Sequence, residues 1–296
     1  MHTNYSRPKL PISVASGAFG TLFYERLRKS GVTVQLSDNL DLLSTEYGDI
    51  SLGIHLDYIM AGARIIKTPT FSAQRRSQAK FGTDHLVRNI NIEACRIARQ
   101  AVEKSGKKNI RIAGVIGPTN ISLSRNNTPP RLLRYDYSEQ IDALMEGGAE
   151  ILLIESVYDM RNGEEAVYAA LDYFCKHGVE VPVILSAVTD ERGKLASGHM
   201  LYQSPIKDDI CAWGLNCFSP YTAHMYSAIE RLRDTAPLAI SLMPNAGFPT
   251  VNGNYPIAPQ EFAESLEPYI SNRIIDIVGG CCGTTPKHIY EISKLL

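Results

Sequence analysis

Short apolar runs rich in β-branched residues recur along the chain, and turn-forming residues bound each of them. Their nearly continuous apolar character is typical of parallel strands that helices cover on both faces of a sheet. We predict eight such strands, over residues 11–16, 63–69, 109–117, 150–156, 181–188, 210–217, 237–244 and 273–280.

Segments with the apolar spacing of helices lie between several of these runs. They cover residues 85–106, 138–148, 163–178, 222–235 and 258–270. Strands that alternate with helices at the spacing of βαβ units fit either a doubly wound sheet or a closed barrel. Eight units that fill the chain without a break in composition favour closure. We therefore predict an α/β fold, a single (β/α)8 TIM barrel domain over residues 1–296.

Composition narrows the class of protein. The 296 residues are 44% hydrophobic and 21% charged, which suits a large buried core. Lys+Arg 30 against Asp+Glu 31 gives a net charge of -1, which argues against a nucleic-acid or membrane-surface binder. The chain has no apolar run of membrane-spanning length, and MHTNYSRPKLPIS lacks the apolar segment of a signal peptide. We expect a cytoplasmic protein with reduced thiols.

Loops that follow barrel strands lie at the carboxyl-terminal face, where barrel enzymes place their active sites. The widest gaps follow the first three strands, and residues 119–137 are the most irregular segment. Basic residues gather in these loops, either as solvated charges or as a surface that steers an anionic donor or an acidic partner protein. They are Arg75, Arg76, Lys80, Arg125, Arg131 and Arg134.

Three of the six cysteines end predicted strands: Cys217 the sixth, and Cys281 and Cys282 the eighth. These strands are two places apart around a barrel, so their loops converge. Three thiolates would leave the fourth position of a tetrahedral zinc ion open, as in catalytic sites. Adjacent cysteines serve one metal only if the chain turns, and the glycines of GGCCG permit this turn. For these three cysteines, a role as metal ligands and a role as buried small hydrophobic residues both remain open. For the other three, Cys95, Cys175 and Cys211, we favour burial as small hydrophobic residues.

Six motifs then appear in order along almost the whole chain, and together they resemble the homocysteine S-methyltransferases, a family of zinc-dependent barrels. The GPTN and PNAG stretches are most similar to the homocysteine-binding module of cobalamin-dependent methionine synthase. The motifs are SGAFGT (16–21), IAGVIGPTN (112–120), LLIES (152–156), WGLNC (213–217), MPNAG (243–247) and VGGCCGTTPKHI (278–289).

The resemblance implies that Cys217, Cys281 and Cys282 hold one zinc ion and act in catalysis, with the substrate thiol in the open position. A free thiol is mostly protonated at neutral pH, and the thiolate is the nucleophile. Coordination to zinc lets the substrate lose this proton. Three negative ligands keep the ion electron-rich, so the bound sulfur should stay nucleophilic toward an activated methyl group.

The resemblance also implies substrate contacts. Glu155 matches an acid that binds the substrate amino group, with a solvated carboxylate as the alternative. Asn216 and Asn245 would contact the substrate or orient zinc ligands, and Asn245 would approach the metal when substrate is absent. Ordinary loop roles are the alternative for both. Gly17 and Gly20 in SGAFGT would let backbone N–H groups approach a carboxylate closely, with ordinary turn glycines as the alternative. We also expect Ser16, Gly17 and Ala18 to contact the substrate.

Two departures from the family pattern lie near this pocket. The first strand of the family ends in Asp-Gly, and this chain has Ser16 before Gly17. The second-strand loop of the family reads Glu-Thr-Asn-Thr-Phe, and this chain has KTPTF from Lys67. Losing a carboxylate predicts weaker binding of an ammonium group. Lys67 would instead neutralise Glu155 or attract a carboxylate, so a thiol other than homocysteine remains an alternative acceptor.

We predict a zinc-dependent thiol S-methyltransferase that converts homocysteine to methionine. The chain lacks the Asp-x-His-x-x-Gly signature of a cobalamin module and a second barrel for folate. The methyl group would then come from a corrinoid such as methylcobalamin, or from a folate, carried by a separate protein. S-methylmethionine, betaine and S-adenosylmethionine are the alternative donors.

Two other functions remain as alternatives. A Schiff-base lyase would use Lys67 as the nucleophile and Glu155 as the proton carrier, but it leaves the three strand-end cysteines unexplained. A non-catalytic zinc-binding barrel subunit would follow from loss of the first-strand acid.

Overall fold

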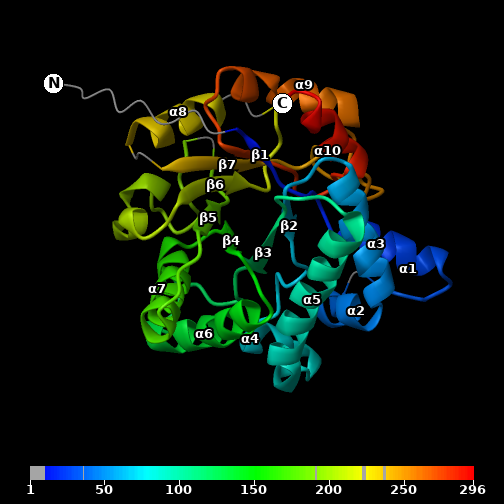
Figure 1. The fold of residues 1–296 in the computed structure, drawn as a ribbon. Coiled ribbons are helices and arrows are strands. Elements are labelled where there is room, and N and C mark those ends of the chain that lie inside the picture. The colour runs from blue at the N-terminus through cyan, green and yellow to red at the C-terminus, as the bar shows by residue number, and fades with distance from the viewer. Residues whose placement is uncertain (1–10, 36, 191, 222–224, 236–237) are drawn as a thin grey trace.

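A computed structural model describes residues 11–35, 37–190, 192–221, 225–235 and 238–296. Parallel strands form an eight-stranded sheet in the order β1-β8-β7-β6-β5-β4-β3-β2. Each pair of neighbours in this order is in parallel register, so the predicted barrel is confirmed (Figure 1). The strands are β1 (Ser13–Val14), β2 (Ile65–Lys67), β3 (Arg111–Ile116), β4 (Ile151–Val157), β5 (Val183–Ala187), β6 (Ala212–Asn216), β7 (Ala239–Met243) and β8 (Ile277–Val278).

The barrel closes between its first two strands. Ala15 and Ile65 form a parallel bridge just past the end of β1. The Ser16 N–H donates to the Ile65 carbonyl at 2.8 Å, and the Arg64 N–H donates to the Val14 carbonyl at 2.7 Å. The ends of all eight strands therefore face one mouth.

Helices surround the strands on the outside (Figure 1). In the part of the chain that the structure describes, β5 and β6 are joined without an α-helix, by short 3-10 helices at Leu201–Gln203 and Pro205–Asp208. The helices are α1 (Gly20–Lys29), α2 (Leu40–Glu46), α3 (Gly48–Met60), α4 (Arg75–Gln78), α5 (Val87–Ser105), α6 (Pro130–Glu146), α7 (Met160–His177), α8 (Met225–Thr235), α9 (Pro259–Ser271) and α10 (Pro286–Ser293).

Each predicted strand is observed in or next to its range, but several helices differ from the expectation. The helix predicted over 138–148 begins at Pro130, because proline fits the first helical turn. The irregular segment predicted over 119–137 is correspondingly shorter. The predicted helix 222–235 is observed from Met225, and residues 222–224 lie outside the described residues, as does residue 237 of the seventh predicted strand.

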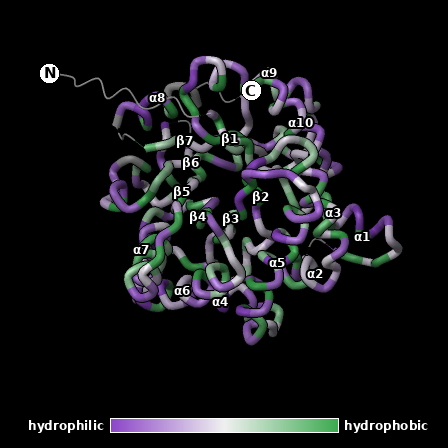
Figure 2. Tube along the Cα trace, viewed as in Figure 1, coloured by the Kyte–Doolittle hydropathy of each residue, from purple (hydrophilic) through white to green (hydrophobic). Residues whose placement is uncertain are grey.

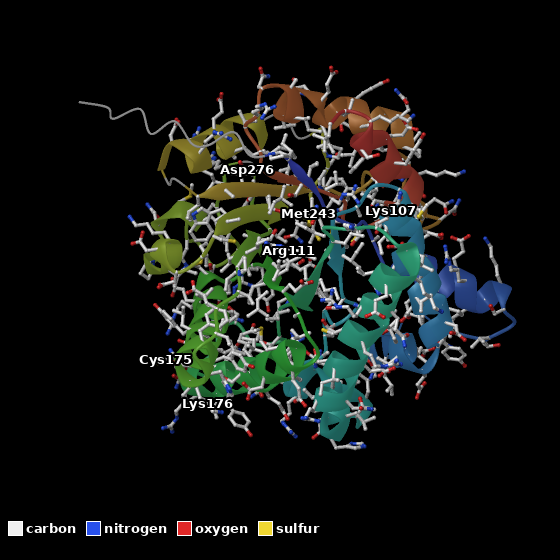
Figure 3. All side chains as sticks on the ribbon, in the orientation of Figure 1. Lys107, Arg111, Cys175, Lys176, Met243 and Asp276 are labelled. Carbon is white, nitrogen blue, oxygen red and sulfur yellow. The ribbon has the colours of Figure 1, made fainter. Side chains whose placement is uncertain are left out.

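Apolar residues form two layers, inside the barrel and between the barrel and its helices. Alternate strand residues point to opposite faces, so one set fills the interior and the other contacts the helices. Figure 2 shows green, hydrophobic stretches along the strands in the middle of the molecule. Met243, labelled in Figure 3, ends β7 inside the barrel. The interior set is Ala15, Ile65, Ala113, Val115, Ile151, Leu153, Ile184, Ala212 and Met243.

Cys95 is buried in α5, as predicted, but Cys175 and Cys211 are exposed, so the expectation of burial is wrong for both. Cys175 lies near the solvent-facing end of α7, and Cys211 precedes β6 at the amino-terminal rim. Among the residues placed by the structure, no helix combines the length and the apolar character needed to cross a membrane.

Candidate metal centre

Three cysteine side chains converge at the carboxyl-terminal mouth of the barrel. Cys217 follows β6, and Cys281 and Cys282 follow β8. The Cys217 and Cys281 sulfurs are 2.9 Å apart, and those of Cys281 and Cys282 are 3.9 Å apart. All three sulfurs lie within 4.8 Å of one another. The structure thus brings together the three thiols that the sequence pointed to.

The spacing of these sulfurs fits a zinc ion. Zn–S bonds of about 2.3 Å in a tetrahedron place two sulfurs about 3.8 Å apart. The Cys281–Cys282 separation of 3.9 Å matches this value. The Cys217–Cys281 separation of 2.9 Å would open by about 0.9 Å around an ion. A set of three half-buried thiols suits a soft, thiolate-binding metal.

Backbone turns aim the thiols at one point. Cys217 has a φ of 60°, a left-handed conformation that turns the chain away from the strand direction. The Cys281 N–H donates to the Pro244 carbonyl at 2.8 Å, and the Ala246 N–H donates to the Cys282 carbonyl at 2.9 Å. The β7 loop therefore holds the turn that carries both adjacent cysteines.

Hydrogen bonds among the thiols favour one thiolate. Hydrogen bonds from Cys217 and then Cys281 lower the pKa of the Cys282 thiol to about 3, and the Tyr255 hydroxyl acts in the same direction. The pKa of Cys217 is raised, first because its thiol donates within the cluster and then because it is buried. The hydrogen bonds within the cluster therefore favour loss of a proton at Cys282.

Asn216 connects three side chains around Cys217. Its Nδ2 lies 3.3 Å from the Cys217 Sγ and donates to the Ser156 Oγ at 2.8 Å. Its Oδ1 accepts from the Ser186 Oγ at 2.8 Å and from the Ser156 N–H at 3.1 Å. The expected role in orienting a candidate ligand therefore has a direct geometric basis.

We expect Asn216→Ala to weaken zinc binding by about 10- to 100-fold, the usual effect of removing a group that orients a ligand. Zinc affinity, measured by competition with a chromogenic chelator, checks this. Ser186→Ala is the matched control, because it removes one partner of Asn216 and leaves the contact with the Cys217 sulfur in place. Equal losses of zinc affinity in both variants would mean that the hydrogen bonds around the end of β6, and not the contact with the Cys217 sulfur, are responsible.

Asn245 lies beside the adjacent cysteines Cys281 and Cys282. Its Oδ1 accepts from the Cys282 N–H at 3.1 Å, and its own N–H donates to the Phe218 carbonyl at 2.8 Å. Asn245 therefore ties the loop after β6 to the loop after β8. Its approach to a metal stays a prediction.

The start of the SGAFGT motif packs against the same loops. The Ser16 Oγ accepts from the Lys67 N–H at 3.1 Å. Gly17 is close-packed, because a Cβ there would lie 2.5 Å from the Thr284 Oγ1. The Ala18 N–H donates to the Thr284 Oγ1 at 3.0 Å. These residues support the mouth, but the Ala18 N–H, at the expected carboxylate site, already has a partner.

Glu155 and Lys67 meet inside the mouth. The Lys67 Nζ lies 3.9 Å from the Glu155 Oε2 and donates to the Gly280 carbonyl at 3.1 Å. Burial raises the pKa of the Glu155 carboxyl, and Lys67 opposes this shift. The two charges that the sequence placed near the pocket are therefore paired.

Two residues that sequence patterns did not single out contribute to the centre. Tyr255 comes from the loop between β7 and α9, and burial followed by the Cys282 charge raises its pKa to about 12. Ser156 has a φ of 60° and its Oγ lies 3.7 Å from the Cys217 sulfur. Tyr255 lies outside the six family motifs, and Ser156 ends the LLIES motif, in which only Glu155 was expected to act.

Three of the six basic residues near the mouth form ion pairs with acids. Arg75 binds Glu139, with Nε 2.7 Å from its Oε2, Arg76 binds Asp136 at 2.8 Å, and Arg134 binds Glu165 at 2.7 Å. Arg125 donates to the Ala196 carbonyl at 3.2 Å. Steering of an anionic partner, one of the two interpretations of these loops, would rest on the other three residues, Lys80, Arg125 and Arg131.

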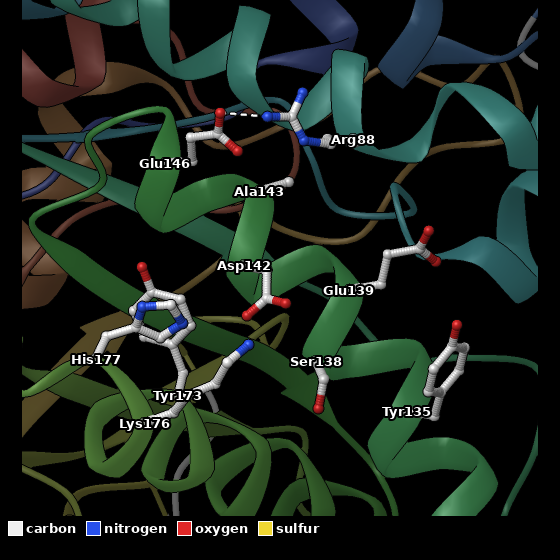
Figure 4. A pocket seen from close by; sticks show the side chains of 10 residues that line it. All are labelled: Arg88, Tyr135, Ser138, Glu139, Asp142, Ala143, Glu146, Tyr173, Lys176 and His177. Atoms are coloured by element: carbon white, nitrogen blue, oxygen red, sulfur yellow. Dashed lines mark hydrogen bonds and ion pairs between the residues drawn. The ribbon is translucent and has the colours of Figure 1, made fainter.

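A surface cavity of about 560 Å³ lies away from the cysteines, along α6 and its neighbours (Figure 4). Tyr173 stacks on His177 with ring centroids 4.2 Å apart, and Arg88 pairs with Glu146. These contacts are typical of an open groove between charged helix surfaces.

The fold and the cysteine cluster together define a barrel protein with a candidate metal–thiolate centre at its carboxyl-terminal mouth. The sequence profile of the homocysteine S-methyltransferase family matches residues 13–296, and the chain belongs to this family. The protein is therefore an enzyme of the methyltransferase class, as its motifs predicted.

Solved structures agree on the fold. The metallated form of the homocysteine methyltransferase MmuM from Escherichia coli is 21% identical over 97% of this chain and 96% of that chain, with a TM-score of 0.77. Its apo form is 20% identical over 97% of each chain, with a TM-score of 0.73. A GH18 chitinase from Pseudoalteromonas aurantia is 10% identical over 83% of this chain and 97% of that chain, with a TM-score of 0.51.

Proposed function

We propose that the protein is a zinc-dependent thiol S-methyltransferase that methylates homocysteine to methionine. The observation that carries this proposal is the convergence of three thiols, within 4.8 Å, beside a buried carboxylate. Three thiolates leave the fourth position of a zinc ion open for a substrate sulfur. Family membership supports methyl transfer and gives no support to the Schiff-base alternative.

Cys217, Cys281 and Cys282 would hold the ion. Bound zinc would favour loss of the substrate thiol proton and leave the sulfur electron-rich. Asn216 orients Cys217, and Asn245 fixes the turn at Cys282. Glu155 would accept the substrate ammonium, because its buried carboxylate has an oxygen without a hydrogen-bond partner.

The reaction itself is a displacement at carbon. The substrate sulfur gives up its proton and attacks the methyl carbon of the donor. The new C–S bond forms as the bond between the methyl group and the donor breaks, and that bonding pair leaves with the donor. Groups that orient the sulfur contribute by holding it in line with the breaking bond.

We assign the donor to a corrinoid or folate-linked methyl group carried by a separate protein. The GPTN stretch, which resembles the homocysteine-binding module of cobalamin-dependent methionine synthase, follows β3 and so lies at the same mouth as the cysteines. S-methylmethionine and betaine are the alternatives.

A parallel assay tests both parts of the proposal. Zinc-loaded protein and homocysteine are incubated with methylcobalamin, methyltetrahydrofolate, S-methylmethionine or betaine, and methionine is measured by mass spectrometry. We expect turnover with methylcobalamin and little with methyltetrahydrofolate alone, because folate needs a further module to shuttle its methyl group. Turnover with S-methylmethionine only would overturn the corrinoid assignment. Zinc binding without turnover with any donor would favour a non-catalytic subunit.

A further inference from the structure

A buried pair of opposite charges lies at the barrel mouth without a direct hydrogen bond. Lys67 ends β2 and Glu155 lies near the end of β4, and each residue is only 9% exposed. The Nζ and Oε2 atoms are 3.9 Å apart, beyond hydrogen-bond distance. Buried ions are strongly favoured only when hydrogen bonds satisfy them as well. The gap between these two charges therefore needs an explanation.

Both groups have unused hydrogen-bonding capacity. The Glu155 Oε2 is buried and has no hydrogen-bond partner. The Lys67 ammonium donates to the Gly280 carbonyl at 3.1 Å and contacts the Met243 Sδ at 3.9 Å. An ammonium has three donors, so it retains capacity for a ligand. The pair thus offers one anionic acceptor and one cationic donor to the same small space.

This pair shares the space of the thiol cluster. The carbonyl that holds the Lys67 ammonium belongs to Gly280, the residue directly before Cys281. A small thiol with its sulfur at the cysteines would therefore place its polar end at Lys67 and Glu155.

An α-amino acid carries an ammonium and a carboxylate on one carbon, a pattern of opposite charges complementary to this pair. The Ala18 N–H offers less to the carboxylate, because it already donates to the Thr284 Oγ1 at 3.0 Å. Charge-assisted bonds from a lysine ammonium to a carboxylate are also stronger than those from a neutral amide.

We propose that Lys67 binds the α-carboxylate of the acceptor, while Glu155 binds its ammonium. The inference rests on the proposed thiol S-methyltransferase function and adds a specificity-determining residue to it. Lys67 then converts the mouth into a site for the zwitterionic end of an amino-acid thiol. The contrary reading is that Lys67 only neutralises Glu155, which would weaken recognition of the ammonium.

Three thiols with the same spacing between the sulfur and the carbon that bears the charged groups distinguish these two interpretations. Homocysteine carries both charged groups, 4-mercaptobutyrate lacks the ammonium, and 3-mercaptopropylamine lacks the carboxylate. The zinc-loaded wild type, Lys67→Met and Glu155→Gln are compared for kcat/KM with a common donor and for thiol affinity by calorimetry.

We expect Lys67→Met to lower affinity and kcat/KM at least tenfold for homocysteine and 4-mercaptobutyrate, with a change below threefold for 3-mercaptopropylamine. Glu155→Gln should weaken homocysteine and 3-mercaptopropylamine and spare 4-mercaptobutyrate. A purely structural role would weaken all three thiols equally. The double variant Lys67→Met/Glu155→Gln leaves no unpaired buried charge, so it controls for misfolding of either single variant and should lose selectivity among the three thiols.

Tighter binding of homocysteine or 3-mercaptopropylamine by Lys67→Met would overturn the proposal and favour neutralisation. Equal losses with all three thiols would also overturn it. Failure of the Lys67 proposal and failure of the proposed methyltransferase activity can be told apart, because calorimetry measures thiol binding without turnover. Selective binding without methylation by any donor would refute the proposed activity and retain the role of Lys67.

Discussion

Cys281→Ala is expected to abolish zinc binding and methyl transfer while the barrel stays folded. Two remaining thiols cannot hold the ion as three do, and Cys281 lies in direct contact with both of the others. The three cysteines are only partly buried and lie in loops at the rim, outside the two packed apolar layers. Zinc per chain, measured by mass spectrometry of the metal, should fall from about one to near zero, and circular dichroism should be unchanged.

Cys175→Ser is the matched control for this loss. Cys175 is exposed on α7 and lies outside the cysteine cluster, so its replacement should leave both zinc content and activity unchanged. Replacing Cys217, Cys281 and Cys282 together is the most severe test of the centre. A triple variant that still held one zinc per chain would show that the metal binds elsewhere.

Sequence patterns predicted the barrel and its cysteine cluster because both follow from alternation and topology. Buried parallel strands have an apolar signature that loops do not share. Once eight such strands close into a barrel, their carboxyl ends meet at one face. Cys217 and Cys281 are 64 residues apart in sequence, yet the order of their strands was enough to predict their proximity.

Local patterns were less informative where tertiary contacts decide the conformation. The segment between β1 and β2 holds three helices, α1 to α3, that were not predicted. The apolar residues of α3 are spread around the helix and do not form one stripe, so periodicity gives a weak signal there. The left-handed backbone of Cys217 and the position of Tyr255 also depend on neighbours that are distant in sequence.

For the substrate-binding residues, the sequence predicted which charged side chains lie near the pocket but not how they are arranged. Lys67 was open to three interpretations, as a partner of Glu155, as a carboxylate site and as a Schiff-base nucleophile. Only the structure gives the 3.9 Å gap and the unpartnered oxygen that make the first two roles compatible in one site.

Gly283→Ala is expected to cause the second large loss, through the turn that carries Cys281 and Cys282. Gly283 has a φ of +78°, and a Cβ there would lie 2.0 Å from the Cγ of Tyr255. The Tyr255 ring is part-buried against this turn, and its hydroxyl lowers the pKa of the Cys282 thiol. The substitution must therefore move either the ring or the two thiols. We expect zinc affinity and kcat/KM each to fall at least tenfold, measured by chelator competition and by steady-state assay.

Gly253→Ala separates this clash from backbone strain. Gly253 has nearly the same φ, +76°, and lies in the loop that carries Tyr255, but a Cβ there would meet nothing within 4 Å. Both variants carry the cost of a left-handed alanine, about 1–2 kcal/mol, and only Gly283→Ala carries the collision. Zinc affinity should therefore stay within threefold of wild type in Gly253→Ala. If both variants lost zinc equally, strain in the loops would explain the effect, and the contact between Tyr255 and the cysteine turn would have no part in holding the metal.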